Sequence, residues 1–187
     1  MLKGGAGEIQ VRDLGGMQAA ALRYFETAGP FAAAVSAATG APLPAPLSAA
    51  AVALPGIPDG ELVLAWSRPS ETLVLTASTT ALSALASQLE SVDGGQLVNL
   101  TGALAVLRLA GTHTADFIGR LGSAPPPRRG EARRGRLADV PVLSLSVRAG
   151  EVWLVVDRAY ARHLRSWIGA TLADWPLLAV EPVNSIE

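Results

Sequence analysis

The two histidines are the first residues whose type could support catalysis. His113 follows Gly111 at a predicted strand–helix junction and precedes Asp116, so that carboxylate could orient the imidazole for acid–base work. No serine or lysine nucleophile is tied to this pair by a motif, and a loop-capping histidine explains the spacing better. His163 lies within a predicted helix, and neither histidine has a second ligand four positions away. We therefore predict no catalytic and no metal-binding residue in this chain.

Cofactor-binding patterns are missing as well. The sequence contains no cysteine, which excludes disulfides, thiolate catalysis, iron–sulfur clusters and cysteine-ligated zinc. The glycine-rich stretch Gly4-Gly5-Ala6-Gly7 lacks the preceding strand that dinucleotide- and nucleotide-binding loops require. We therefore predict that no residue of this chain binds a cofactor.

Arginines gather in one predicted loop, residues 123–136, which is also rich in proline. Guanidinium groups bind oxyanions in a bidentate way, so the loop could hold phosphate, nucleic acid or an acidic partner. A solvated loop is the plainer interpretation, and the lack of interleaved aromatic residues argues against single-stranded nucleic acid. We keep the loop as a candidate partner-docking surface. Its candidate residues are Arg128, Arg129, Arg133 and Arg134, with Arg136 nearby and Glu131 as the only acid among them.

A predicted helix over residues 158–170 carries the second candidate surface. Tyr160, Leu164 and Trp167 fall on one face at helical spacing, which favours packing onto the core. In that arrangement Trp153, on the preceding strand, lies near Trp167. The alternative is a docking surface, because tryptophan, tyrosine and arginine supply much of the binding energy at interfaces. The candidate interface residues on this helix are Arg158, Tyr160, Arg162, Arg165 and Trp167.

Composition describes an apolar chain of 187 residues, of which 50% are hydrophobic and 17% charged. This length suffices for one domain with its own core. The low charge fits either a core rich in small residues or a surface partly covered by another subunit. A formal net charge of −1 argues against nucleic-acid and membrane partners. Without a secretory signal or a run of about 18 apolar residues, we predict cytoplasmic localisation.

The elements that would position these residues occur twice. Residues 62–86 and 142–167 each contain an apolar run, a tight turn, a second apolar run and a helical stretch. Upstream of each copy, another strand-like run ends in Leu-Arg. An arginine and a glutamate stand at matching places in the two turns, namely Arg68 and Glu71, then Arg148 and Glu151.

We predict an α+β fold of internally duplicated β-α-β-β-α units with pseudo-twofold symmetry. The expected organisation is a single domain over 1–187, with a first repeat at about 8–92, a second at about 97–172 and a tail at 173–187. Predicted strands are 9–11, 19–25, 62–67, 72–76, 98–109, 142–147 and 152–156, with an edge strand at 177–183. Predicted helices are 30–39, 79–89, 115–121 and 158–170, and residues 41–60 form an ordered proline-rich connection.

Several segments of the second half resemble one known family. They are residues 100–111, Asp116-Phe117-Ile118, residues 137–143 and the helix start at 157–167. Together they resemble the gamma subunit of heterotetrameric sarcosine oxidase. That family is similar to the folate-binding domain of the aminomethyltransferases, which agrees with a duplicated α+β unit.

The resemblance implies a place in a cytoplasmic complex that oxidatively demethylates sarcosine or a related N-methyl amine and passes the one-carbon unit to tetrahydrofolate. It also implies that FAD, FMN, NAD and tetrahydrofolate are bound by larger partner subunits, while this chain buttresses them as a non-catalytic accessory subunit. The chain departs from the family pattern at Ala159, where serine is typical, and in the arginine-rich loop. These departures leave the N-methyl substrate open.

Two other functions remain open. A free-standing folate-binding aminomethyltransferase-like protein would need an acid against the pteridine, for which Asp13 and Asp139 are the only candidates. A module that binds an acidic partner through the arginine-rich loop would lose affinity steeply with added salt.

Overall fold

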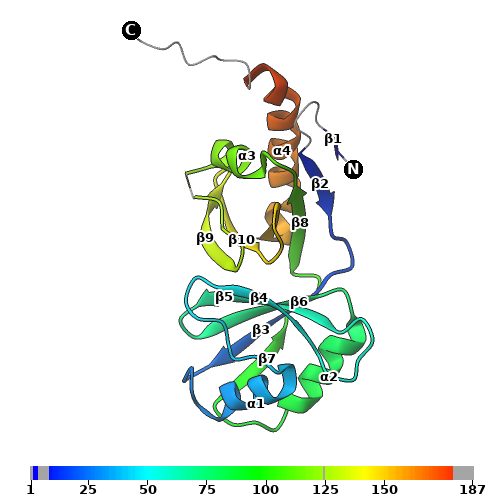
Figure 1. Cartoon of the computed structure of the whole chain (residues 1–187), viewed down its shortest axis with the longest axis vertical. Coiled ribbons are helices and arrows are strands. Elements are labelled where there is room, and N and C mark those ends of the chain that lie inside the picture. Colours follow the sequence, from blue (N-terminus) through cyan, green and yellow to red (C-terminus); the bar gives the residue numbers. More distant parts are fainter. Residues whose placement is uncertain (1, 4–8, 124, 179–187) are drawn as a thin grey trace.

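The central strands of this protein carry apolar residues on both of their faces, so each of them needs cover on both sides. The computed structural model, which describes residues 2–3, 9–123 and 125–178, provides this cover with two antiparallel sheets that face each other. Helices cover the outer face of each sheet (Figure 1). The resulting layers run helix, sheet, sheet, helix from one end of the molecule to the other.

The first sheet is formed by a continuous part of the chain. Its strands are β3 (Gln18–Tyr24), β4 (Ala49–Ala53), β5 (Glu61–Arg68), β6 (Glu71–Thr76) and β7 (Gly95–Asn99). Their order is β4-β5-β6-β3-β7, and every neighbouring pair is antiparallel.

The second sheet combines the start of the chain with its second half. Its strands are β1 (Leu2–Lys3), β2 (Gln10–Asp13), β8 (Leu104–Ala110), β9 (Glu131–Leu137), β10 (Val140–Ser146) and β11 (Glu151–Asp157). Their order is β1-β2-β8-β11-β10-β9, again antiparallel throughout. The chain thus begins in this sheet, builds the other one and returns at β8.

Four helices occur in the described residues, and local signals define their ends. They are α1 (Pro30–Thr39), α2 (Thr79–Leu89), α3 (Thr114–Leu121) and α4 (Arg158–Leu178). The Ser78 hydroxyl caps α2 by accepting from the Ala81 amide at 3.2 Å, and Asp157 accepts from the Ala159 amide at 2.8 Å. Among the described helices, none is long and apolar enough to cross a membrane.

Side chains alternate between two apolar layers along each central strand. On β5, Leu62 and Leu64 pack under α1 and α2, whereas Val63 and Ala65 lie between the sheets. β11 follows the same rule, with Trp153 in the inter-sheet layer and its neighbours under α3 and α4. Because small alanines face large side chains there, the sheets can approach at the usual spacing of about 10 Å.

The two sheets are also joined through hydrogen bonds at one edge. The Ala49 amide donates to the Gly130 carbonyl at 2.8 Å, and the Ala132 amide donates to the Leu47 carbonyl at 2.9 Å. These bonds bring β4 and β9, the edge strands of the two sheets, together. The layers therefore share both an apolar core and part of their backbone bonding.

Several predicted elements are confirmed. The structure has a mixed α/β fold with both predicted hairpins, β5–β6 and β10–β11, each followed by a helix. The predicted helices at 30–39 and 79–89 match α1 and α2 at both ends.

The predicted strand at 98–109 is wrong as a single element. It is divided into β7 and β8, which belong to different sheets. The Asn99 side chain accepts from the Thr101 amide at 2.8 Å, and Gly102 adopts a φ of 86°. This turn chemistry interrupts the apolar alternation and moves the chain from one layer to the other.

Two predicted connections contain strands. The prediction of an arginine-rich loop over 123–136 is wrong from Glu131 onward. That part forms the edge strand β9, which pairs with β10 along its whole length. The proline-rich connection at 41–60 contains β4, which pairs with β5 between the prolines. Both are edge strands, where charged residues and flanking prolines are tolerated.

Helix α4 is longer than predicted and presents a different face. Its buried stripe includes Leu164, Ile168 and Trp175, whereas Tyr160 and Trp167 point outward with about half of their surface exposed. Trp153 does not contact Trp167, because it lies on the opposite face of the sheet, between the two layers. The predicted edge strand at 177–183 begins within α4, and its remaining residues lie outside the described ones.

Candidate functional site

Two buried glutamates occupy matching positions directly after the turns of the two hairpins, β5–β6 and β10–β11. Glu71 begins β6 and Glu151 begins β11, each directly after a tight turn. A buried carboxylate is costly unless it is paired and hydrogen-bonded. Each therefore needs cationic neighbours, and the chain supplies them from a neighbouring strand and from the turn itself.

The pairing around the two glutamates follows one plan. Arg23 on β3 donates through Nε to Glu71 at 3.2 Å, and Arg108 on β8 contacts Glu151 at 2.7 Å. The turn arginine is three positions before the glutamate in both hairpins. Arg68 Nε lies 3.7 Å from Glu71, and Arg148 Nη1 lies 3.9 Å from Glu151.

Both carboxylates are held in the ionised form. Burial raises the pKa of Glu71, but hydrogen bonds from Ser67 and Arg23 and the charges of Arg68 and Arg23 outweigh it and lower that pKa. Burial likewise raises the pKa of Glu151, and Arg108, Trp153 and Arg148 reverse the shift. The hydrogen bond to Glu151 in turn raises the pKa of Arg108. These carboxylates anchor arginines and are poor proton carriers near neutral pH.

The two clusters differ in charge. In the Glu151 cluster, Trp153 Nε1 donates to Glu151 at 2.5 Å, and Arg148 also pairs with Glu61 at 2.5 Å. Two arginines thus meet two carboxylates. The Glu71 cluster consists of Glu71, Arg23, Arg68, Ser67 and Arg134, so three arginines meet one carboxylate among the described residues.

Arg134 reaches the Glu71 cluster from the opposite sheet. Its Nε donates to the Ser67 carbonyl at 2.8 Å, its Nη2 donates to the Ser67 hydroxyl, and it lies 3.9 Å from Glu71. A cavity of about 300 Å³ opens beside it, between the sheets, with Leu73, Leu143 and Tyr160 in its lining. On the other side of the cluster, a depression of about 790 Å³ is lined by Arg23, Arg68 and Phe25, among others.

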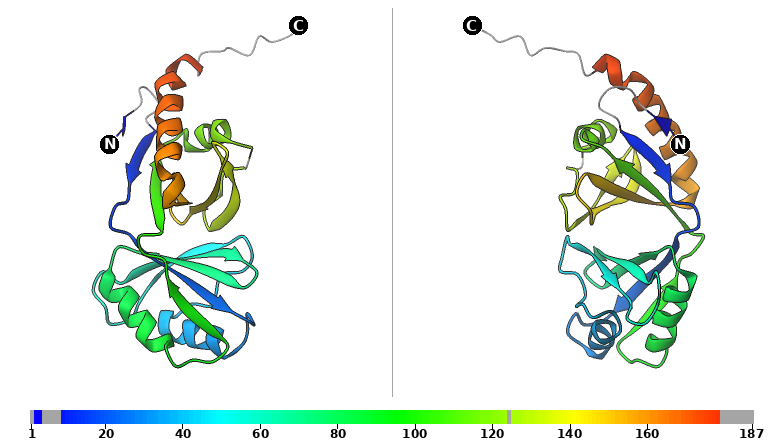
Figure 2. Two further views of the ribbon diagram at one scale, coloured as in Figure 1. Left: turned by 180° about the vertical axis from the view of Figure 1, so that it is seen from behind. Right: turned by 45° about the vertical axis from the view of Figure 1, so that its right-hand side comes forward.

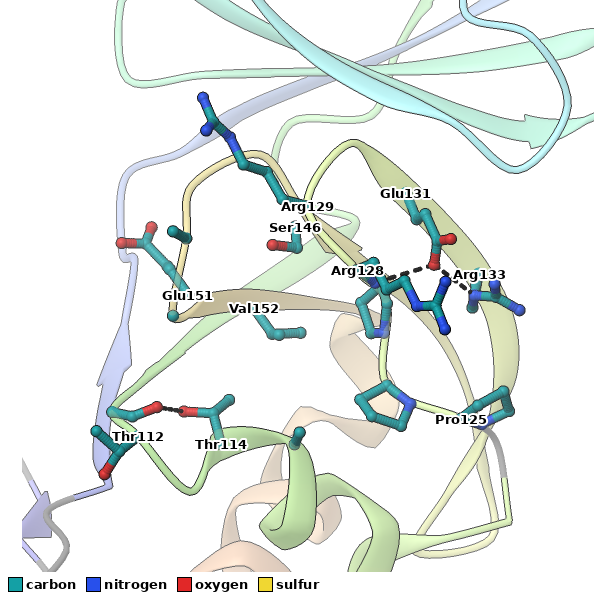
Figure 3. Close-up of a pocket in the computed structure, with 16 residues that line it drawn as sticks. Thr112, Thr114, Pro125, Arg128, Arg129, Glu131, Arg133, Ser146, Glu151 and Val152 are labelled. Atoms are coloured by element: carbon teal, nitrogen blue, oxygen red, sulfur yellow. Dashed lines mark hydrogen bonds and ion pairs between the residues drawn. The ribbon is translucent and has the colours of Figure 1, made fainter.

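Of the other predicted arginines, Arg133 lies on the far face of β9, and Arg128 and Arg129 lie in the segment just before this strand. Arg133 donates to Glu131 at 2.9 Å, and the Arg128 amide donates to the same carboxylate at 2.9 Å (Figure 3). The Arg133 hydrogen bond is the main cause that lowers the pKa of Glu131 to about 2. Together with these residues, Arg129 borders a pocket of about 680 Å³ between the start of α3 and the hairpin β10–β11, and its side chain points away from Glu131.

The predicted arginine cluster is therefore divided into two surfaces. Successive side chains of a strand point to opposite faces, so Arg133 and Arg134 are separated by the sheet. Arg134 joins the inter-sheet layer, while Arg128, Arg129 and Arg133 border the pocket beside α3. The loop interpretation missed this separation because it assigned no strand there.

The predicted interface residues of α4 are all exposed. Figure 2 shows α4 along the outside of the six-stranded sheet, away from the other layer. Arg165 pairs with Asp13, and Arg158 Nη2 donates to the Leu104 carbonyl at 3.3 Å. Tyr160 and Trp167 are 47% and 50% exposed, and Arg162 is exposed as well. Their role in partner binding stays a prediction.

The histidines occupy structural positions. His113 Nδ1 lies 3.5 Å from Asp116 at the start of α3, with the side chain half exposed. A ring nitrogen of His163 lies 2.9 Å from the Ala138 carbonyl, and its ring contacts Trp167. Within the described residues, no group of three histidine, aspartate or glutamate side chains is placed to hold a metal ion.

Sequence reasoning missed Arg23, Arg68 and Glu71 as members of a charged site. The signal was present in the repeat, because both copies carry an arginine and a glutamate around the turn and a Leu-Arg pair upstream. Nothing in the sequence, however, indicated that Arg134 would join them from the other sheet. Phe25, which is 89% exposed, was predicted only as the end of a strand.

The layered fold belongs to a class that known proteins share. No protein-family model and no curated protein matches the sequence. Among solved structures, a chain of heterotetrameric sarcosine oxidase from Corynebacterium sp. U-96, in complex with pyrrole 2-carboxylate, is similar with a TM-score of 0.78 and 21% identity. The match covers 92% of this chain and 88% of that one.

A second solved structure has the same fold within a longer protein. The glycine cleavage system aminomethyltransferase T from Bartonella henselae is similar with a TM-score of 0.65 and 13% identity. The match covers 86% of this chain but only 45% of the aminomethyltransferase. At sequence identities this low, the two similarities show the fold of this chain and nothing more about it.

Proposed function

We propose that this chain is a non-catalytic, gamma-type accessory subunit of a flavin-dependent heteromeric oxidase or dehydrogenase. The complex would demethylate sarcosine or a related N-methyl amine and pass the one-carbon unit to tetrahydrofolate. One observation carries the proposal: the chain matches a chain of heterotetrameric sarcosine oxidase over nearly the full length of both. It corresponds to less than half of the aminomethyltransferase, a catalyst in a single longer chain.

In this proposal the cofactors FAD, FMN, NAD and tetrahydrofolate belong to the larger subunits, and the complex works in the cytoplasm. The buried carboxylates of this chain support that division of labour, because Glu71 and Glu151 are ionised and engaged by arginines. The chain forms one domain composed of two related halves. The matching turns at Arg68–Glu71 and Arg148–Glu151 support the proposal that the halves arose by duplication.

Exposed aromatic side chains support a role in assembly. Phe25, Tyr160 and Trp167 are large and 89%, 47% and 50% exposed, on a chain with few charged residues. Aromatic residues and arginine are enriched where interfaces gain most of their binding energy. The face of α4 with Tyr160, Arg162 and Trp167 is the predicted docking surface, together with the arginines that border β9.

The test is purification of the tagged full-length chain from its native cytoplasm. We expect larger subunits to co-elute, a flavin absorbance spectrum in the eluate and oxygen or dye reduction that depends on sarcosine or another N-methyl amine. The chain produced alone should be colourless. A lone wild-type chain that recruits no flavoprotein from the native extract would contradict the proposal.

A second function is favoured by the cavity between the sheets. A free-standing folate-binding protein would place its ligand in a concave site, and the 300 Å³ cavity beside Arg134 has apolar walls with arginines and the carboxylates of Glu71 and Asp157 in its lining. Asp13, one of the two predicted acids, lies elsewhere and pairs with Arg165, while Asp139 lies in the turn between β9 and β10. Calorimetric titration of the isolated chain with tetrahydrofolate decides this alternative, and absence of heat removes it.

A further inference from the structure

The arginines around Glu71 use only part of their hydrogen-bonding capacity. Arg23 and Arg68 both approach the carboxylate through Nε. Within the described part of the chain, the terminal nitrogens of these two side chains make no hydrogen bond. Because a guanidinium carries five N–H donors, most donors of both arginines remain open to an external oxyanion.

The position of Arg134 adds electrostatic repulsion between arginines, which a bound anion would reduce. Burial lowers the pKa of the Arg134 guanidinium, and repulsion from Arg68 lowers it further, against the attraction of Glu71. Two guanidinium groups are thus held near each other with one carboxylate between three arginines. A second carboxylate at this place would offset the repulsion and accept the open donors.

The Glu151 cluster serves as an internal comparison. It holds a buried glutamate at the matching turn with two arginines, and a second carboxylate, Glu61, balances the charge. Holding the buried glutamate therefore does not require a third arginine. Between these two clusters of described residues, only the Glu71 cluster has more arginines than carboxylates among its ion pairs.

The surroundings of the cluster favour a protein partner over a small free anion. Phe25 is 89% exposed and lines the depression that also contains Arg23 and Arg68. Tyr160 lines the cavity beside Arg134. Exposed aromatic rings beside arginines are typical of interface centres, whereas a small oxyanion needs no exposed phenyl ring.

We propose that the cluster of Arg23, Arg68 and Arg134 docks an acidic side chain of a larger subunit, with an apolar residue of that subunit packed on Phe25. The inference rests on the proposed function and names the surface through which this chain binds its complex. The surface meets the outer face of α4 at Tyr160, which lines the cavity beside Arg134, and it joins the two sheets at the Glu71 cluster.

The test compares Arg68→Gln with Arg148→Gln in the tagged full-length chain. The two arginines are matched, since each lies three positions before a buried glutamate and is 62% or 50% exposed at the side chain. Glu71 keeps Arg23 and Ser67 in the first variant, and Glu151 keeps Arg108 and Trp153 in the second, so both should fold. A third variant, Phe25→Ala, tests the apolar contact.

Retention of the larger subunits is measured on the immobilised complex as salt is raised. We expect Arg68→Gln and Phe25→Ala to speed dissociation about three- to tenfold, and Arg148→Gln to match the wild type. The difference for Arg68→Gln should shrink at high salt because the lost interaction is electrostatic. If Arg68→Gln dissociates no faster than Arg148→Gln, the docking proposal is wrong while the proposed function stands.

A second experiment, on the isolated chain, tests the docking site independently of the proposed function. The isolated chain is titrated with a short polyglutamate peptide and with inorganic phosphate. Salt-sensitive peptide binding that Arg68→Gln weakens and Arg148→Gln leaves intact supports the docking site, even if the wild-type chain is recovered without larger subunits. Binding of phosphate but not of the peptide would indicate a small-anion site and overturn the proposal, as would no binding of either probe by a chain recovered alone.

Discussion

At the scale of single residues, the two buried glutamates link charge to stability. Each is ionised in the folded protein because arginines compensate for its burial. In the unfolded chain the same groups return to the ordinary pKa near 4.5. The unfolded state therefore binds more protons as the pH falls, and the folded state loses stability.

We predict that the free energy of unfolding is level near neutral pH and falls as the pH drops below about 4.5, toward the lower folded pKa values. Glu151→Gln removes one of these groups, so it should cost about 1–3 kcal/mol at pH 7 and make the acid decline shallower. Urea unfolding between neutral and acidic pH measures both effects. The control is Glu90→Gln, at an exposed helix end, which should stay within about 0.5 kcal/mol of the wild type.

At the scale of elements, helix α3 illustrates a close approach that the sequence does not reveal. Gly122 follows the helix in an extended conformation, which any residue can adopt. A Cβ atom there would lie 2.2 Å from the Arg136 carbonyl oxygen, so β9 leaves no room for a side chain. Gly119, one turn earlier, is exposed and has no atom within 4 Å of such a Cβ.

This contrast gives a paired prediction. Gly122→Ala should destabilise the protein by about 1–3 kcal/mol, because the helix end must move away from the sheet. Gly119→Ala should stabilise it by about 0.5–1 kcal/mol, because alanine favours the helix and meets no neighbour. Thermal or urea unfolding of the two variants provides the measurement. Equal effects of the same sign would contradict the close packing of α3 on β9.

Helix α4 allows the contribution of its buried face to stability to be tested apart from the contribution of its exposed face to assembly. Leu164→Ala removes a fully buried side chain from the stripe that covers the sheet and should cost about 2–5 kcal/mol. Trp167→Ala changes an exposed side chain on the outer face and should alter the free energy of unfolding by about 0.5 kcal/mol or less. If α4 also docks a subunit, only the second variant should lower retention of the larger subunits without loss of stability.

Which elements could be predicted depends on how local their signals are. Helix α1 follows from Pro30 and Gly40 at its ends, and helix α2 follows from apolar residues at three- and four-residue spacing, signals that act within a few turns of the chain. Strand β9 could not be recognised, because its arginines are tolerated only at a sheet edge and its partner, β10, defines it. The exposed residues of α4 were predicted as a candidate surface, but Tyr160 and Trp167 were also placed on the buried face.

The charged site escaped prediction for a related reason. Arg23, Arg68 and Arg134 come from three strands in two sheets, and no local pattern brings them together. The repeated arginine–glutamate spacing predicted matching turns but carried no information about the third arginine. Its contribution depends on the β9 register, which directs Arg134 and not Arg133 into the inter-sheet layer.

At the scale of the whole molecule, the inter-sheet layer makes the two halves depend on each other. Leu75 and Leu145 are fully buried there, from opposite sheets, and Trp153 lies in the same layer. The chain also crosses between sheets after β2 and after β7, and backbone hydrogen bonds join β4 to β9. Neither half can expose its inner face without losing apolar burial shared with the other.

We therefore predict that the isolated chain unfolds in one cooperative transition, with calorimetric and van 't Hoff enthalpies equal. Circular dichroism, which reports all elements, and tryptophan fluorescence, to which the inter-sheet Trp153 contributes, should give coincident curves. Leu145→Ala should lower the midpoint of the single transition without splitting it, because both halves lose the same contact. Two transitions in the wild-type chain, or a Leu145→Ala variant in which one half melts separately, would show that the halves are independent domains with only a weak interface.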